Sequence, residues 1–212
     1  SQAHLMNNIR GILLVVVSMA GYSLEDMFIK SLTETLPTGQ VMFVLGLGGA
    51  IVFGAMALRQ RQPLFSGGAL SGPVLFRTAA EGLGALAFIT SLSLVPLSTV
   101  AAVFQATPLA ITLGAALFLG EQVGWRRWSA ILIGFMGVLL IIRPGMQGFQ
   151  PASLFVLISV IAIAARDLAT RRITANVSST VVSFYGFAAL AVVGPFLLLA
   201  TGTPQPMDQS HV

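Results

Sequence analysis

Two ionisable side chains lie one helical turn apart inside an apolar segment of the sequence. Arg77 and Glu81 are separated by four positions, so on a helix they share a face and can form an ion pair. If the helix enters hydrocarbon near Val74, Glu81 lies roughly 10 Å deep, at ~1.5 Å per residue. A charge in that environment costs at least ~2.5 kcal/mol and usually faces a protein interior or water. Arg77 and Glu81 are therefore candidate substrate-binding residues, and Glu81 could also bind a coupling proton.

The same pair has a structural interpretation that the spacing leaves open. If the membrane segment begins at Thr78, the 19 residues from there to Pro96 are still enough to cross a bilayer. Arg77 would then extend to the membrane surface, and Glu81 would only neutralise it.

The first apolar segment carries a second polar face. Ser18, Tyr22 and Glu25 follow one another at intervals of four and three residues, which places them on one side of a helix. We expect Tyr22 and Glu25 to line the mouth of a cavity and to contact substrate. The alternative is a solvated helix end at which Asp26 pairs with Lys30.

A proline inside a long apolar segment points to the next candidate. Pro108 has no N–H, so the carbonyl of Phe104 loses its usual helical partner. In a membrane that carbonyl needs another partner. Gln105 and Thr107 are close enough to supply one or to line a cavity. We therefore count Gln105 among the expected substrate-binding residues, with a proline kink satisfied by nearby side chains as the alternative.

The composition indicates an integral membrane protein. The chain has 212 residues, of which 56% are hydrophobic and 8% are charged, whereas about 25% are charged in a soluble domain. Seven apolar segments are long enough to span a bilayer as helices. They are residues 10–30, 39–58, 74–95, 97–119, 127–143, 152–170 and 180–200. The predicted fold class is an all-α, polytopic helix bundle.

Small residues and basic residues add two expectations about these segments. Small side chains at every fourth position predict close helix contacts along segment 97–119; they are Ser98, Ala102, Ala106, Ala110 and Gly114. Basic residues concentrate on the side of the membrane that holds the N-terminus, which predicts a cytoplasmic N-terminus. They are Arg10, Arg59, Arg61, Arg77, Arg126, Arg127, Arg171 and Arg172, against Lys30 and Arg143 on the other side.

The sequence contains a weak internal repeat. A shift of 141 residues places Arg166, Asp167, Arg171 and Phe184 opposite Glu25, Asp26, Lys30 and Phe43. The shift moves the first span onto the sixth, so five spans are skipped and the two copies have opposite orientations. Inverted repeats of this kind recur in secondary transporters, where substrate binds between the repeats near the membrane midplane.

Several classes of function are excluded by the residues present. The basic residues are dispersed between apolar segments, so no nucleic-acid-binding patch is expected. Residues 82–87 match a dinucleotide-binding pattern but lie within a membrane span. With no cysteine and no histidine in the middle of a span, only a carboxylate such as Glu81 remains for catalysis. We expect no enzyme activity, catalytic residue, cofactor or metal, and transport driven by a gradient rather than by a nucleotide.

The segment from Arg77 to Gly145 carries a set of motifs: Arg77 itself and residues 91–109, 117–121 (LFLGE) and 133–145 (IGFMGVLLIIRPG). With these motifs, the segment resembles the EamA domain of the drug/metabolite transporter superfamily. It extends back to the first span and so covers the whole first repeat. Within the superfamily, the chain looks most similar to bacterial metabolite exporters and S-adenosylmethionine uptake proteins.

The resemblance implies ten helices in two inverted five-helix repeats around a central cavity. Residues 9–145 would form the first repeat, and residues 151–212 would supply two helices of the second repeat and a polar tail. The implied function is secondary transport of a small metabolite or drug-like compound, by alternating access, across a bacterial inner membrane. A complete member would have three more spans, so the alternative is a truncated, non-transporting membrane protein that acts through helix association with a partner or as a homodimer.

Overall fold

The computed structural model describes residues 2–201, with side chains from residue 7 onward, and this part of the chain is built from helices and connecting loops. The helices are α1 (Gln2–Thr33), α2 (Thr38–Arg59), α3 (Gly72–Leu94), α4 (Leu97–Phe104), α5 (Thr107–Phe118), α6 (Trp125–Ile142), α7 (Ser153–Thr170) and α8 (Ser179–Thr201). Within these described residues, seven segments are long and apolar enough to cross a membrane, with α4 and α5 together making one of them. The predicted all-α polytopic fold is confirmed.

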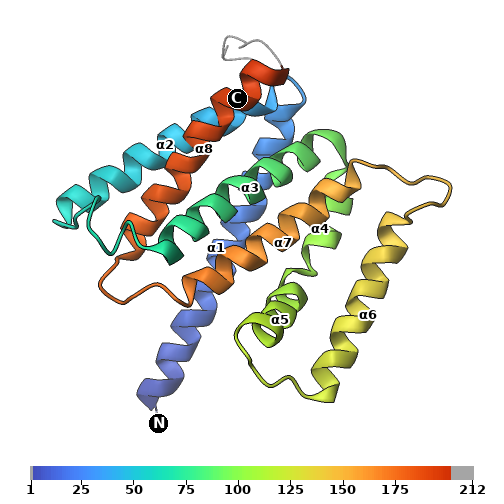
Figure 1. Cartoon of the computed structure of the whole chain (residues 1–212), viewed down its shortest axis with the longest axis horizontal. Helices are drawn as coiled ribbons and strands as arrows, with labels where there is room; N and C mark the ends of the chain where they lie inside the picture. The colour runs from blue at the N-terminus through green and yellow to red at the C-terminus, as the bar shows by residue number, and fades with distance from the viewer. Residues whose placement is uncertain (1, 202–212) are drawn as a thin grey trace.

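Helices α2 and α8 make the most extensive helix contact and lie side by side (Figure 1). Glycines allow the two backbones to approach closely, as membrane helices require. A Cβ atom on Gly46 would lie 2.2 Å from the backbone nitrogen of Ala191, and one on Gly194 would lie 2.6 Å from the carbonyl oxygen of Gly39. The 141-residue shift carries α2 onto residues 179–200, nearly the whole of α8. The two helices in contact are therefore the ones that the predicted repeat would make equivalent.

Helices α3 and α7 form the second large contact and also lie side by side (Figure 1). Near the middle of α3, the hydroxyl of Ser159 donates to the carbonyl oxygen of Gly84 at 3.2 Å. A Cβ atom on Gly84 would lie 2.9 Å from Ile163 Cδ1, so the helices are tightly packed there. Beyond this point both helices contribute buried apolar side chains to one core cluster, among them Leu92 and Val156.

The predicted continuous helix over 97–119 is wrong in one respect, because the chain breaks it at Gln105 and Ala106. The break follows from Pro108, which cannot donate to the carbonyl of Phe104. The hydroxyl of Thr107 donates to that oxygen at 2.6 Å instead. The expectation that a neighbouring side chain satisfies this carbonyl is confirmed, and Thr107 is the residue that does so.

The break also divides the predicted stripe of small residues. Ser98 and Ala102 are exposed, whereas Ala106 and Gly114 are buried. Gly114 lies against α7, where a Cβ atom would meet Leu168 Cδ1 at 2.4 Å. The stripe therefore faces the protein interior at Ala106 and Gly114, but not at Ser98 and Ala102.

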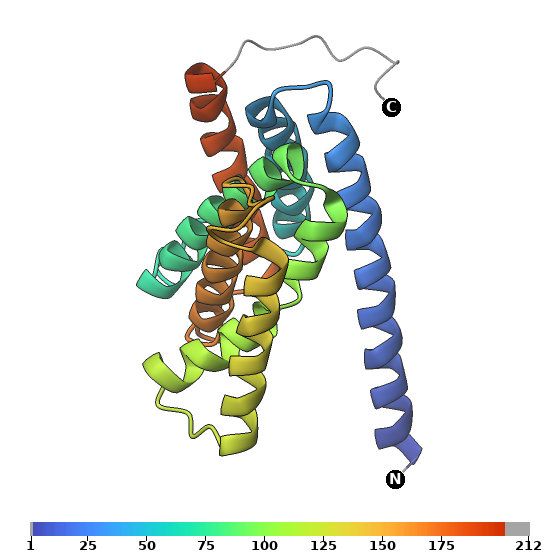
Figure 2. The ribbon, with the colours of Figure 1, turned by 90° about the vertical axis from the view of Figure 1, so that its right-hand side faces the viewer.

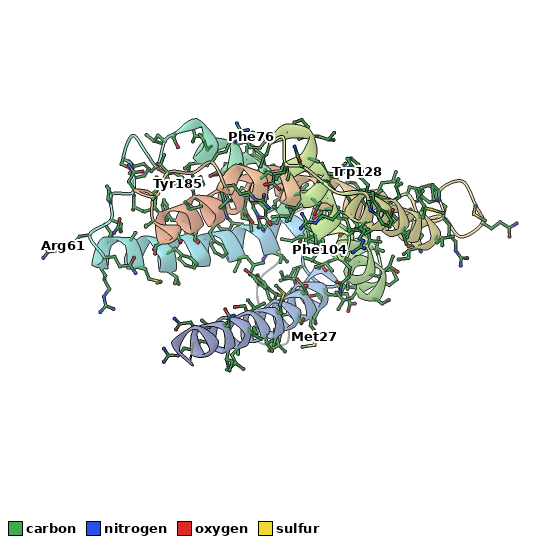
Figure 3. All side chains as sticks on the ribbon, turned by 90° about the horizontal axis from the view of Figure 1, so that it is seen from below. Met27, Arg61, Phe76, Phe104, Trp128 and Tyr185 are labelled. Carbon is green, nitrogen blue, oxygen red and sulfur yellow. The ribbon has the colours of Figure 1, made fainter. Side chains whose placement is uncertain are left out.

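Helix α1 stands apart from the other helices along most of its length (Figures 2 and 3). Met27 points away from the bundle (Figure 3) and is 49% exposed. Near the end of α1, the Lys30 ammonium donates to the carbonyl oxygens of Leu92 at 2.6 Å and Val95 at 3.3 Å. These carbonyls lie at the end of α3, where helical partners are lacking and a cation is favourable. Lys30 makes this contact rather than the alternative pair with Asp26.

Candidate functional site

Four charged side chains from α3 and α7 form what we call the charge cluster: Arg77, Glu81, Arg166 and Asp167. The guanidinium of Arg166 stands at its centre. Its Nη1 atom donates to both carboxylate oxygens of Glu81, at 3.2 and 3.1 Å. Its Nε and Nη2 atoms lie 2.9 and 2.8 Å from Asp167 Oδ1. One arginine therefore joins two carboxylates, which the fixed fork of donors on a guanidinium makes possible.

Arg77 completes the charge cluster from the other side of Glu81. Its Nη2 atom lies 3.6 Å from Glu81 Oε2. Its Nε atom donates to the hydroxyl of Thr170 at 2.9 Å, and that hydroxyl donates to the carbonyl oxygen of Arg166 at 2.9 Å. The Nη1 atom of Arg77 is buried and has no hydrogen-bond partner in the described part of the chain. The cluster thus keeps one unused donor.

The charge cluster lies where the start of α3 meets the end of α7. The side chains of Arg77, Glu81 and Arg166 are 16%, 20% and 25% exposed, and that of Asp167 is 39% exposed. Helix α8 covers the cluster at Gly186, where a Cβ atom would lie 3.4 Å from Glu81 Cγ. The glycine leaves room for the two side chains of α3 beneath it.

The charge cluster is electrically neutral, with two cations and two anions. Pairing offsets part of the cost of holding these groups away from water, and losing one partner would leave an uncompensated charge. Apart from the unused Nη1 donor of Arg77, the paired groups can bind charged groups of a solute only if the internal pairs separate. No group of three His, Cys, Asp or Glu residues able to hold a metal ion exists among the described residues.

The structure brings together two of the five predicted substrate-binding residues, Arg77 and Glu81. Tyr22 is 59% exposed and Glu25 is also exposed, both on α1. Gln105 is exposed at the break between α4 and α5. No hydrogen bond or ion pair within residues 7–201 joins any of these three side chains to the charge cluster.

Sequence reasoning placed Arg166 and Asp167 at a helix end and did not join them to Glu81. The signal was present, because a cation and a carboxylate lie near the start of α3 and near the end of α7, in otherwise apolar spans. Gly186 and Thr170 had no such signal, since their importance comes only from the helices that pack beside them.

A second ion pair lies outside the charge cluster and is about half exposed. Arg171 Nη1 and Glu121 Oε1 are 2.8 Å apart, with side chains 47% and 50% exposed. The pair connects the loop after α5 to the residue that follows α7. Exposed pairs of this kind contribute little to stability, so Arg171 is a useful comparison for Arg166.

Membrane-length helices and a neutral ion network held between them define a multi-pass membrane protein with a polar site among its spans. The chain belongs to the EamA-like transporter family, whose model matches residues 9–143. The matched segment runs from α1 to the residue after α6 and so ends before α7.

Individual relatives are named as transporters rather than as enzymes. The chain is 33% identical to a riboflavin transporter of Rhizobium johnstonii over 62% of this chain and 44% of the relative. It is 25% identical to an S-adenosylmethionine uptake transporter of Rickettsia prowazekii over 87% and 63%. It is 24% identical to the pseudopaline exporter CntI of Pseudomonas aeruginosa over 86% and 64%. The chain thus spans less than two thirds of the length of each relative.

Proposed function

We propose that this chain forms part of a secondary transporter that moves a small organic solute across the cytoplasmic membrane of a bacterium. Transport proceeds by alternating access, with residues 9–145 rocking against the partial second repeat that starts near residue 151. A gradient of protons or another ion drives the movement, and the N-terminus faces the cytoplasm. No cofactor takes part.

The observation that supports this proposal most directly is the contact between α3 and α7. The two helices come from different proposed repeats, and their shared surface changes from apolar and tightly packed at Gly84 to charged at Glu81 and Arg166. Charged groups between repeats are expected where a solute path crosses a membrane protein. Arg77 and Glu81 are thus proposed to line that path, with Tyr22, Glu25 and Gln105 as further solute contacts.

The names of the relatives suggest which solutes to test. Riboflavin, S-adenosylmethionine and pseudopaline are different molecules, so we propose the broad class of small polar metabolites rather than one compound. Direction also differs, since the relatives include an uptake transporter and an exporter.

A flux measurement tests the proposal. Proteoliposomes that contain the chain are supplied with each of these labelled solutes, with and without an imposed proton gradient. We expect saturable uptake of at least one solute, which the gradient increases and which empty liposomes lack. Glu81→Gln should reduce that uptake at least about tenfold, as expected when a charged contact is lost. Uptake equal to that of empty liposomes for every solute would overturn the proposal.

A second candidate function is helix association without transport, and the exposure of α1 favours it. A large part of this helix is apolar yet exposed, including Leu14 at 69% and Val17 at 68%. Another helix could cover that surface, from a second copy or from a partner. A defined dimer in detergent, combined with no flux of any tested solute, would support this candidate over the first.

A further inference from the structure

We infer that the charge cluster is the contact that closes the cytoplasmic half of the protein, and that α3 and α7 separate there around a pivot at Gly84. This inference rests on the proposed function for its purpose, but its geometry can be tested without flux. The cytoplasmic assignment follows from the distribution of basic residues, which places the start of α3 and the end of α7 on the inner side.

The first argument is that the kind of interaction between α3 and α7 changes along their contact. At the middle of α3, Gly84 lies against Ile163, and its carbonyl accepts from Ser159. Toward the outer side, both helices contribute buried apolar side chains, such as Leu92 and Val156, to one core cluster. Toward the inner side, ion pairs and a hydroxyl contact replace it. The tightly packed part suits a pivot, because backbones in direct contact cannot slide far without steric clashes.

The second argument concerns the dependence of the ion pairs on water. Separation of Glu81 from Arg166 in a dry environment would leave two uncompensated charges, which is costly. The cost falls steeply if water enters as the helices part, because hydration replaces the lost contacts. The helices of the inner half can therefore separate when water enters between them but not in its absence. The closed state consequently blocks the passage of water and ions.

The third argument is the unused donor of Arg77. In the closed arrangement its Nη1 atom is buried without a partner in the described part of the chain. A buried unsatisfied donor carries a free-energy cost that water or an anionic solute group would remove on opening. This lowers the energy difference between the closed and open states. The ion pairs of the charge cluster thus favour the closed state, whereas the unpaired Nη1 donor of Arg77 favours the open state.

Arg166 is the residue on which the closing contact depends most. Its guanidinium holds Glu81 through Nη1 while Nε and Nη2 hold Asp167. A lysine ammonium at the same place keeps the charge but loses the planar fork, so it cannot reproduce both contacts. Arg166→Lys should therefore close the inner half incompletely, whereas Arg166→Gln should leave it largely open.

These 212 residues contain no cysteine, so a single introduced cysteine is the only thiol among them. Ala80→Cys places a reporter beside Glu81 at a position that is 9% exposed. Ser91→Cys places a second reporter at a fully buried position in the outer half of α3. Each reporter is combined with Glu81→Gln or Arg166→Gln. Inside-out membrane vesicles are then treated with a membrane-impermeant maleimide, and the rate of labelling is measured.

We expect labelling at residue 80 to accelerate at least about tenfold in both variants, as expected for loss of a charged hydrogen-bonded contact. Labelling at residue 91 should stay at its basal rate, because the pivot keeps the outer half closed. Arg171→Gln is the matched control. It removes an arginine from an exposed ion pair just beyond the end of α7, outside the charge cluster, and should leave both rates unchanged.

Other results would overturn the inference. An unchanged rate at residue 80, or an equal rise at both reporters, would contradict a closing contact with a pivot. If the glutamine variants fail to insert, Arg166→Lys and Thr170→Val test the same contact with milder changes, and basal labelling in both would also overturn it. Failure of flux with the expected labelling would reject only the transport proposal. Normal flux with unchanged labelling would reject only the closing contact.

Discussion

A single hydroxyl decides how the fourth span tolerates its proline. Pro108 leaves the carbonyl of Phe104 without a helical N–H, and Thr107 donates to it at 2.6 Å. In the hydrocarbon of a bilayer, this carbonyl cannot accept a hydrogen bond from water instead. The nearby Thr112 hydroxyl also donates to a carbonyl, that of Pro108, at 2.9 Å, but this acceptor lies inside α5. The two threonines thus make similar hydrogen bonds, but only the carbonyl of Phe104 lacks its helical N–H partner because of the proline.

Thr107→Val should therefore destabilise the protein by about 1–3 kcal/mol, the cost of leaving a buried acceptor unsatisfied. Thr112→Val removes a hydroxyl of the same kind and should cost well under that amount. Thermal unfolding of the detergent-solubilised protein, followed by size-exclusion chromatography of heated samples, measures both. Equal losses for the two variants would show that the Phe104 carbonyl has no special need for Thr107.

At the scale of helices, the contact between α2 and α8 depends on the absence of side chains. The Cβ position of Gly46 would lie 2.2 Å from the backbone nitrogen of Ala191, closer than real Cβ contacts allow. Gly48 lies two positions away on the same helix, and a Cβ atom there would meet nothing within 4 Å. The same residue type thus has opposite roles on two faces of α2.

Gly46→Ala should destabilise the protein by about 1–3 kcal/mol, because overpacking forces the two helices apart. Gly48→Ala should be neutral or stabilise it by up to about 1 kcal/mol, since alanine is the better helix former. The midpoint of unfolding in a graded denaturant series distinguishes the two. A loss at Gly48 as large as that at Gly46 would mean that close packing against α8 does not control this helix.

At the scale of the whole molecule, the orientation in the membrane determines which half the charge cluster closes. The exposed residue Thr35 lies between α1 and α2, and the exposed residue Gly67 lies between α2 and α3. If the N-terminus is cytoplasmic, the first loop faces outward and the second faces inward.

Thr35→Cys should therefore react with an impermeant maleimide added to intact cells, because its loop would lie on the outer surface. Gly67→Cys should react only after the membrane is permeabilised. Labelling of the two variants before and after permeabilisation measures this directly. The reverse pattern would invert the orientation and assign the charge cluster to the outer half.

The sequence alone determined the number, position and helical nature of the membrane spans. Span length and apolarity are imposed locally by the bilayer, so each segment, such as 39–58 or 180–200, could be identified without its neighbours. The ion pair between Arg77 and Glu81 could also be predicted from the sequence, because it depends only on helical spacing. The partner that Thr107 provides to Phe104 followed from the chemistry of proline within one turn.

Which helices meet, and therefore which charges pair, depends on how the whole chain packs. Arg166 is 85 positions from Glu81, and no local rule selects that distance. Lys30 reaches the end of α3 instead of its neighbour Asp26, because packing brings unpaired carbonyls within its reach. Pairing between helices depends on their relative rotation and depth, which a short stretch of sequence does not encode. For this reason the spans were predictable, whereas the complete charge cluster was not.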